Sequence, residues 1–380
     1  MTLATIGRFH FLEQARALSA AGGLDRFYCD DPRVLAAVGW RRGRWLARAG
    51  VFDRYGGSHA RAASALAWRG AQVAQVAAGS ALVKINSAFA LETLRGGQAG
   101  AVWVDHGSLD ERYVSAHMQA EAERWGDDLV AAGGNHGSPI LVERQAEEFG
   151  RATGVVVASD LARRSLAARG VDPGKIRVVH LGVDAARFSP RGNTTFPGRF
   201  RILHAGPVTF NKGVHRLIDA FRMAALPGAE LRIVGPVPDA RVRERLESQA
   251  AGLRVEFHPP VRQSRLPELF AESDLFVLAS LADGFGLTVL QAMACALPAL
   301  VTDQCGCAEV LTGCPAAQIV RAADSAGLAA ALTVAYEQRE PNADRGGAAR
   351  SWVQRLSWEA HAACLRPALN AGDRSLEAKS

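Results

Sequence analysis

The sequence predicts an α/β protein of two doubly wound, Rossmann-like domains, because strands and helices alternate along both halves of the chain. Apolar runs of strand length separate segments with helical spacing, and this alternation restarts at about residue 200. The chain has 380 residues and is 48% hydrophobic, enough for two domains of ordinary size, each with its own core. We expect domains at 1–190 and 198–355, followed by a last helix at 356–372.

The first half opens with a strand, a helix and a second strand. The helix at 11–20 is ended by Gly22-Gly23, and Ser159 is the expected cap of a later helix. Residues 33–79 are expected to be helical and basic, and 127–138 to be a glycine-rich loop. The strands expected in this half lie at 3–6, 27–29, 81–85, 101–104, 155–158 and 176–180, and the further helices at 111–125, 141–149 and 160–169.

The second half repeats the alternation with shorter connections. Its expected strands lie at 201–205, 231–234, 255–258, 275–279, 299–301 and 318–320, and its helices near 215–222, 242–250, 265–271 and 287–295. Ligands of such sheets bind beyond the carboxyl ends of the strands, so the residues that follow each strand are the first candidates for function.

The most informative stretch runs from residue 274 to residue 310. Asp283-Gly-Phe-Gly286 separates a strand from a helix that ends before Pro298. The start of a helix leaves backbone N–H groups unpaired, and a glycine-rich loop before it can hold a diphosphate. Gln291 lies about two helical turns beyond Asp283, which suits a long ligand touched at two points. An ordinary strand–helix connection has the same spacing.

Residues 283–298 resemble the Glu-x7-Glu segment of the family-4 retaining glycosyltransferases, which use nucleotide sugars. That segment usually reads Glu-Gly-Phe-Gly, three or four apolar residues, then Glu-Ala-Met-Ala-Cys-Gly-x-Pro; here Asp283 and Gln291 replace the two glutamates. The resemblance implies the GT-B architecture, with two domains facing across a cleft and a C-terminal helix that crosses back. It places Asp283 at the donor sugar, where it is a catalytic candidate, and Gln291 at the ribose. The residues expected around the donor diphosphate are Gly284, Phe285, Gly286, Leu287 and Thr288.

Lys212 is the third candidate, in Asn211-Lys212-Gly213 after the strand at 201–205. In the family the lysine of Lys-Gly meets the donor phosphates, often beside an arginine at the position of Pro207. A lysine there stabilises a leaving diphosphate without a metal, and no Asp-x-Asp occurs in the chain. We therefore expect no metal and no cofactor beyond the nucleotide-diphosphate-sugar co-substrate. The alternative is an exposed loop lysine.

The first half offers two polar turns. Gly7-Arg8-Phe-His10 resembles the amino-terminal turn of a bacterial branch of the family, which implies donor contact for Gly7 and acceptor contact for Arg8 and His10. Asp105-His106-Gly-Ser ends a strand, and all four residues are expected in one cleft, with Asp105 on the acceptor side and His106 catalytic. The branch often has Glu-Arg-Gly-Ser here, so this turn departs from it. The alternative for His106 is a bond to a turn carbonyl.

Charge and composition limit which partners and which cellular compartment are expected. The net charge is +6, and residues 41–69 carry seven arginines, interleaved with aromatic residues, against Asp53 alone. Glu121 and Glu123 are candidates to face this stretch. It is either a solvated helical surface or a contact for anionic lipid or an anionic acceptor; no motif supports nucleic acid. The arginines are Arg41, Arg42, Arg44, Arg48, Arg54, Arg61 and Arg69.

The expected location is cytoplasmic, with peripheral contact at the inner face of the cell membrane. No apolar run has the length of a transmembrane helix, and the early first strand leaves no room for a signal peptide. The six cysteines lack a zinc spacing and are expected to be reduced thiols.

Together these features predict a metal-independent retaining glycosyltransferase acting on a glycan, lipid-linked or small-molecule acceptor. The alternative is a catalytically impaired relative that binds a sugar or nucleotide as a partner subunit, because Pro207, Asp283 and Gln291 all depart from the family. A nucleotide-sugar epimerase fits segment 283–298 less well. A Rossmann dehydrogenase is disfavoured because no Gly-x-Gly-x-x-Gly follows the first strand of either domain.

Overall fold

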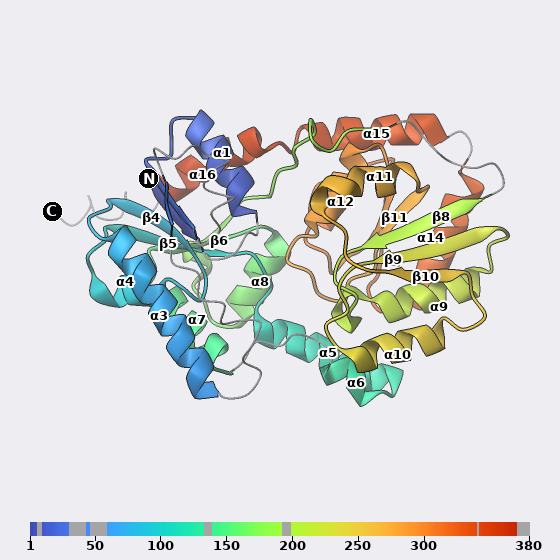
Figure 1. Cartoon of the computed structure of the whole chain (residues 1–380), viewed down its shortest axis with the longest axis horizontal. Helices are drawn as coiled ribbons and strands as arrows, with labels where there is room; N and C mark the ends of the chain where they lie inside the picture. The colour runs from blue at the N-terminus through green and yellow to red at the C-terminus, as the bar shows by residue number, and fades with distance from the viewer. Residues whose placement is uncertain are drawn as a thin grey trace. The chain divides into compact units, whose positions relative to one another are not determined.

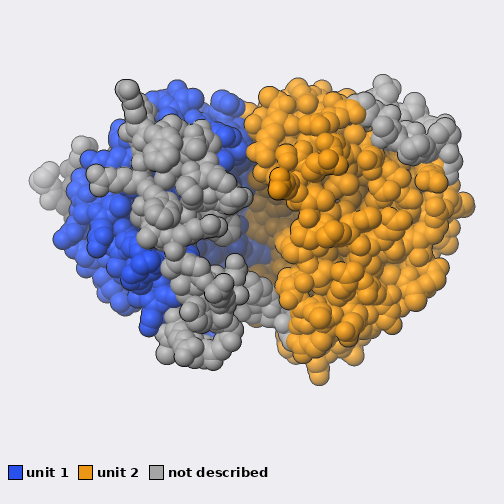
Figure 2. Space-filling model, viewed as in Figure 1, with its two compact units in different colours: residues 1–111, 137–182, 358–380 blue, residues 112–136, 183–357 orange. Residues whose placement is uncertain are grey.

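The computed structural model describes residues 1–5, 10–29, 43–45, 59–132, 139–191, 199–339 and 342–370. The chain divides into two compact units, shown in different colours in Figure 2. Unit 1 comprises residues 1–111, 137–182 and 358–380, and unit 2 comprises residues 112–136 and 183–357. Within the described ranges, no helix combines the length and the apolar character needed to cross a bilayer.

Unit 1 is built on a parallel sheet of seven strands in the order β3-β2-β1-β4-β5-β6-β7 (Figure 1). Its strands are β1 Thr2–Thr5, β2 Arg26–Cys29, β3 Gly43–Trp45, β4 Leu82–Asn86, β5 Ala101–His106, β6 Gly154–Val157 and β7 Ile176–Val178. Its helices are α1 Phe11–Ala20, α3 His59–Ala77, α4 Leu91–Gly96, α7 Pro139–Arg151, α8 Asp160–Ala168 and α16 Trp358–Asn370. The expectation that 33–79 is helical is wrong at β3, which pairs in parallel with β2, and correct over α3.

Unit 2 repeats the same winding with six parallel strands in the order β10-β9-β8-β11-β12-β13. Its strands are β8 Phe200–Ala205, β9 Ala229–Val234, β10 Val255–His258, β11 Leu275–Leu278, β12 Ala299–Thr302 and β13 Ala317–Val320. Its helices are α5 Glu111–Trp125, α6 Asp128–Ala132, α9 Val214–Ala224, α10 Ala240–Gln249, α11 Leu266–Ala271, α12 Leu287–Ala294, α13 Ala308–Leu311, α14 Ser325–Glu337 and α15 Asn342–Gln354. Two doubly wound α/β sheets are therefore confirmed.

Two segments belong to a unit whose other residues lie far from them in the sequence. Within the predicted first domain, residues 112–136 belong to unit 2, because Met118, Ala122 and Val130 are buried in its hydrophobic core. The helix α6 also occupies part of the expected loop at 127–138. At the other end, α16 packs against α1 in unit 1, so the last helix does return to the first unit.

Local signals in the sequence account for several helix ends. The Ser159 hydroxyl accepts the Ala162 N–H at 3.1 Å and caps α8, as predicted. Gly170 follows α8 with a φ of +95°, a conformation that glycine adopts without strain. The Asp324 carboxylate caps α14 in the same way by accepting the Gly327 N–H at 2.8 Å.

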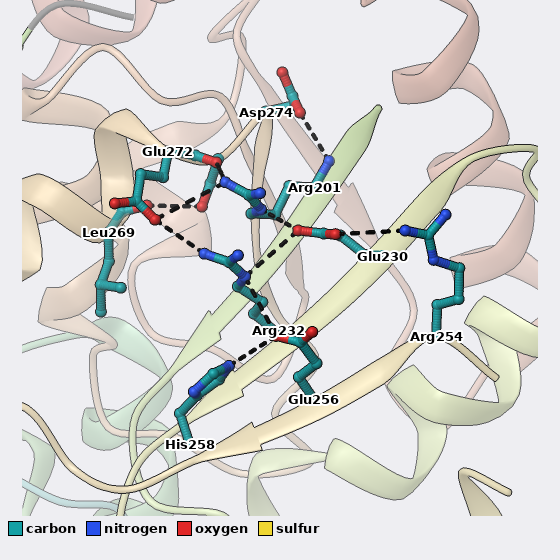
Figure 3. A network of polar contacts seen from close by, with 10 residues as sticks. Arg201, Glu230, Arg232, Arg254, Glu256, His258, Leu269, Glu272 and Asp274 are labelled. Atoms are coloured by element: carbon teal, nitrogen blue, oxygen red, sulfur yellow. Dashed lines mark hydrogen bonds and ion pairs between the residues drawn. The ribbon is translucent and has the colours of Figure 1, made fainter. Parts of the chain in front are cut away.

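A network of charged side chains covers one part of the unit 2 sheet (Figure 3). Arg201 near the start of β8 forms a buried ion pair with Glu230 near the start of β9, and Arg232 bonds Glu272 at 2.9 Å. Burial alone would raise the pKa of Glu230, but the Arg201 hydrogen bond and the charges of the neighbouring arginines together lower that pKa. Arg201 and Glu230 lie near the amino ends of their strands, away from the carboxyl ends of β8 and β9, where ligands bind in such sheets.

Candidate functional site

The loops after β8 and β11 meet in unit 2 at the point where the strand order reverses. The Leu281 N–H donates to the Asn211 carbonyl at 2.8 Å, which joins the two loops through their backbones. Gly213 ends the first loop with a φ of +67°, and a Cβ at this position would lie 1.8 Å from the Ala279 oxygen. Only glycine therefore fits directly after Lys212, which gives the Lys-Gly pair a structural reason.

Lys212 and Asp283 are brought together by these loops. The Lys212 Nζ lies 2.6 Å from Asp283 Oδ2, and the two side chains are 20% and 12% exposed. Asp283 Oδ1 also accepts the Phe285 N–H at 3.2 Å. Burial would lower the pKa of Lys212, but the charge and the hydrogen bond of Asp283, together with smaller contributions from nearby groups, raise that pKa overall, so the amine stays protonated. The pair thus places a partly exposed cation beside a carboxylate at a sheet edge where ligands bind.

The amino end of α12 begins next to this ion pair. Gly286 precedes the helix with a φ of +83° and provides no side-chain cap for the first N–H groups. Its Cα lies against the loop after β12, since an added Cβ would be 2.5 Å from the Cys305 sulfur. The uncapped N–H groups and the helix dipole both favour an anion here, and the diphosphate contact of residues 284–288 stays a prediction.

Gln291 lies in the second turn of α12. Its side chain is 5% exposed and has no hydrogen-bond partner among the described residues. A buried amide normally finds a partner, so this one has donors and an acceptor available for a ligand. No structural observation contradicts the expected contact with a ribose, and the contact stays a prediction.

Helix α5 provides a second set of polar residues that the sequence analysis missed. Glu121 is 1% exposed and bonds His215 Nε2 at 2.9 Å and Arg216 Nε at 2.5 Å, both in the first turn of α9. Burial alone would raise the pKa of Glu121, but these two partners lower it to about 2. The expectation that Glu121 faces the basic stretch is wrong, because this carboxylate instead secures the helix that begins directly after Lys212-Gly213.

A cavity of about 330 Å³ lies between α5 and the loops that follow β11, β12 and β13. His117, Arg124 and Arg321 line it together with Asp303 and Gln304, so its wall presents both donors and acceptors. Gln304 also accepts the Tyr113 hydroxyl at 2.9 Å through its side chain and the Asp283 N–H at 2.9 Å through its carbonyl. The cavity is therefore connected by direct bonds to the loop that carries Asp283. No local pattern in the sequence links 111–125 to residues about 190 positions away.

The unit 1 candidates behave differently, because Asp105 and His106 point to opposite faces of the sheet. Asp105 accepts a hydrogen bond and ion pair from Lys84 and lies 3.4 Å from His10 Nε2, whereas His106 Nδ1 lies 3.1 Å from the Ser87 hydroxyl. Neighbouring residues of a strand alternate between faces, so the expectation that both point into one cleft is wrong. Gly7 and Arg8 lie outside the described residues.

A buried polar chain connects His10 and Asp105 to the last helix. Lys84 donates to Gln14 Oε1 at 2.8 Å, Gln14 Nε2 lies 2.7 Å from His361 Nε2, and His361 Nδ1 bonds the His180 carbonyl at 2.7 Å. Burial lowers the pKa of Lys84 well below its usual value and that of His10 to about 3. These side chains bond one another inside unit 1, and the chain joins α1, β4, β5 and α16.

His106 is 2% exposed, with its ring edge-on to Phe149. Burial lowers its pKa to about 4, so the imidazole is neutral at pH 7. The neighbouring carboxylate Glu148 accepts the backbone N–H groups of Ala88, Ala90 and Leu91 at the start of α4, and its burial raises its pKa to about 7. This helix start in unit 1 is thus already occupied by a carboxylate of the protein itself.

Residues 199–338 match the family model described as glycosyl transferases group 1. The D-inositol 3-phosphate glycosyltransferase of Mycobacterium tuberculosis (strain H37Rv) is 30% identical over 156 residues, which cover 38% of this chain and 32% of that protein. The same protein of Mycobacterium bovis (strain AF2122/97) matches to the same extent. The match thus spans about a third of the length of these relatives.

Solved structures similar to this chain share its fold along nearly the whole length. Sucrose-phosphate synthase from Thermosynechococcus elongatus has a TM-score of 0.68 at 20% identity and covers 100% of both chains. Anabaena Alr3699/HepE, solved in complex with UDP and glucose, has a TM-score of 0.68 at 16% identity over 98% of this chain and 100% of that one. A trehalose-phosphate synthase from Burkholderia xenovorans has a TM-score of 0.69 at 14% identity, over 97% and 98% of the two chains.

We expect replacement of Lys84 by Met to destabilise unit 1 strongly. The substitution keeps the length of the side chain but leaves the buried Asp105 carboxylate without its cation, and breaking a buried pair costs about 3–5 kcal/mol. Urea unfolding followed by circular dichroism measures the loss. Arg16→Met is the control, because the Arg16–Glu13 pair is a surface pair worth about 0–1 kcal/mol. The double variant Lys84→Met, Asp105→Leu should recover part of the loss, and equal midpoints for Lys84→Met and wild type would contradict the assignment.

Proposed function

We propose that this protein is a glycosyltransferase that moves a sugar from a nucleotide-diphosphate-sugar donor to a hydroxyl of an acceptor, with retention of the anomeric configuration. The observation that carries the proposal is the Lys212–Asp283 pair at the reversal point of the unit 2 sheet, beside the uncapped start of α12. The matched family region, 199–338, contains all of these residues. A relative solved with UDP and glucose supports a nucleotide-sugar donor, and UDP is our first candidate.

The proposed chemistry consists of positioning the donor and stabilising the leaving diphosphate. Lys212 and the N–H groups of residues 284–288 bind the diphosphate, whose negative charge grows as the sugar–oxygen bond breaks. Because Asp283 already contacts Lys212, an arriving diphosphate shares that cation, and the carboxylate becomes available to the donor sugar. The Gln291 side chain forms hydrogen bonds with the ribose hydroxyls. We propose that no metal is required, since the lysine and the helix start supply the positive potential.

The acceptor side is assigned to unit 1, where Arg8 contacts the acceptor and the neutral imidazole of His106 is catalytic, while Gly7 contacts the donor. His10 and Asp105 serve this side indirectly: Asp105 pairs with Lys84 in β4, and His10, the residue before α1, lies 3.4 Å from Asp105. The acceptor is a glycan, a lipid-linked sugar or a small molecule. We assign the protein to the cytoplasm, where nucleotide sugars are the donors, with a peripheral contact to anionic membrane through the basic stretch at 41–69.

Calorimetric titration with UDP, GDP and ADP, without metal and again with a chelator, tests the donor site. We expect one nucleotide to bind with a Kd of about 1–100 μM in both conditions, and Lys212→Ala to weaken it by about tenfold or more, because a charge-assisted contact is lost. Arg222→Ala, at the far end of the helix α9 that follows Lys212, is the matched control and should bind like wild type. No binding by any of the three nucleotides would refute the proposed donor site. Binding without transfer or hydrolysis of the corresponding nucleotide sugar would instead favour a sugar- or nucleotide-binding partner subunit.

A double-mutant cycle with 2′-deoxy-UDP tests the role of Gln291. Gln291→Leu should weaken UDP by about fivefold to tenfold, the value of one or two hydrogen bonds, but should change the affinity for 2′-deoxy-UDP much less. Gln291→Glu should strengthen UDP binding, because a carboxylate bonds ribose hydroxyls more strongly than an amide does. If Gln291→Leu weakened the affinity for UDP and for 2′-deoxy-UDP equally, the proposed contact with the ribose would be wrong, and this side chain would have only a packing role.

Cosedimentation with vesicles at low salt tests the proposed membrane contact. We expect the protein to bind vesicles rich in anionic lipid and not zwitterionic ones. The triple variant with Arg41, Arg42 and Arg44→Glu should lose this binding, because each arginine contributes about 1 kcal/mol near an anionic surface. A matched triple substitution of exposed arginines elsewhere, Arg164, Arg241 and Arg265→Glu, should retain it. Equal binding by the two triple variants would show that charge number alone, and not this stretch, is responsible.

A further inference from the structure

Two cysteine thiols lie in contact beneath the loop that carries Asp283. The Cys305 and Cys307 sulfurs are 3.4 Å apart, both residues are at most 1% exposed, and neither is in a disulfide. They sit in a tight turn after β12, closed by the Ala308 N–H, which donates to the Cys305 carbonyl at 2.9 Å. The turn keeps the two sulfurs on the same side, although Gly306 separates them in sequence.

This turn is bonded residue by residue to the loop at 283–286. The Gly306 N–H donates to the Asp283 carbonyl at 3.0 Å, and the Cys307 N–H donates to the Phe285 carbonyl at 2.7 Å. The Cys305 thiol bonds the same Phe285 carbonyl at 3.3 Å. A Cβ on Gly286 would meet both sulfurs, at 2.5 and 3.4 Å, so the thiols pack directly against the residue that starts α12.

The contacts define a short chain of thiol hydrogen bonds. Cys307 lies within donor distance of the Cys305 sulfur, and Cys305 donates to the Phe285 carbonyl. Burial raises the pKa of Cys307 well above its usual value, so Cys307 rests as a thiol. Among the described residues, no cluster of three or more histidine, cysteine or acidic side chains could hold a metal ion, so the chemistry open to this pair is that of two thiols.

We propose that Cys305 and Cys307 form an oxidation site that closes to a disulfide with a small peroxide and thereby weakens donor binding. One thiol first gives up its proton, and peroxide transfers one oxygen to the resulting thiolate, giving a sulfenic acid and a hydroxide that takes up that proton as water. The second thiol then attacks the sulfenic sulfur and releases a second water. In sum, two thiols and one hydrogen peroxide give one disulfide and two waters. The small size of the oxidant suits a buried pair, which a bulky disulfide reagent reaches only after the loop opens.

Closure changes the loop for two geometric reasons. A disulfide bond is about 2.05 Å long, so the sulfurs must approach each other by more than an ångström from 3.4 Å. The Phe285 carbonyl also loses the thiol proton that Cys305 donates to it. Both changes act on residues 283–286, which hold Asp283 against Lys212 and position the start of α12. The effect on nucleotide affinity rests on the proposed function, whereas the formation of the cross-link does not.

The test treats the reduced protein with hydrogen peroxide and locates the cross-link by tandem mass spectrometry. We expect loss of two hydrogens between Cys305 and Cys307, a shifted thermal unfolding midpoint, and UDP binding weakened by about tenfold, all restored by dithiothreitol. Cys307→Ser should bind UDP equally before and after peroxide, and Cys307→Ala serves in its place if the serine variant does not fold. Cys314→Ser, which removes another buried thiol of unit 2, should stay as sensitive as wild type.

Three outcomes would overturn the proposal. The first is a peroxide dose that oxidises the exposed Cys364 without joining Cys305 to Cys307. The second is a sulfinic acid on one of the two sulfurs with no cross-link. The third is a cross-link that leaves UDP affinity and the unfolding midpoint unchanged. If the reduced protein binds no nucleotide, the proposed function fails, and the mass and the unfolding midpoint still decide whether the oxidation site exists.

Discussion

The ion pair between Lys212 and Asp283 depends on the strand order of unit 2, and the candidate site depends on that pair. β8 and β11 are neighbours at the point where the strand order reverses, so the loops after them start side by side at the carboxyl edge, where ligands bind in such sheets. The pair joins residues 71 positions apart, one from each loop. It keeps a protonated amine and a carboxylate partly exposed where the first N–H groups of α12 also point. Every other feature of the site positions one of these groups.

The loops of the site are held in place because their backbones approach neighbouring segments closely. Gly213 and Gly286 both have positive φ, and each lies against an atom that a side chain would strike, the Ala279 oxygen and the Cys305 sulfur respectively. The loop at 283–286 also forms backbone bonds with Gln304, Gly306 and Cys307, so it has the character of a short parallel ladder rather than a free loop. The cysteine turn is therefore bonded directly to the loop that leads into the start of α12.

Buried polar side chains have a different role in each unit. In unit 1, Lys84, Asp105, Gln14 and His361 satisfy one another and join the last helix to the sheet. In unit 2, Glu121 bonds the first turn of α9 and brings α5 onto the sheet edge beside the 330 Å³ cavity. The first network stabilises a domain, and the second fixes the helix that follows Lys212 and builds one wall next to Asp283.

The sequence by itself determined the two α/β halves, the strand positions of unit 2 and the candidates Lys212, Asp283 and Gln291, because hydrophobic period, glycine position and motif spacing are local properties. Tertiary structure alone decided the rest. Packing and the pleat of a strand decide three further features. They are the membership of 112–136 in unit 2, the opposite directions of Asp105 and His106, and the contact between the Cys305 and Cys307 sulfurs. The pairing of Glu121 with His215 spans 94 positions, and no local pattern specifies which distant helix a buried carboxylate will meet.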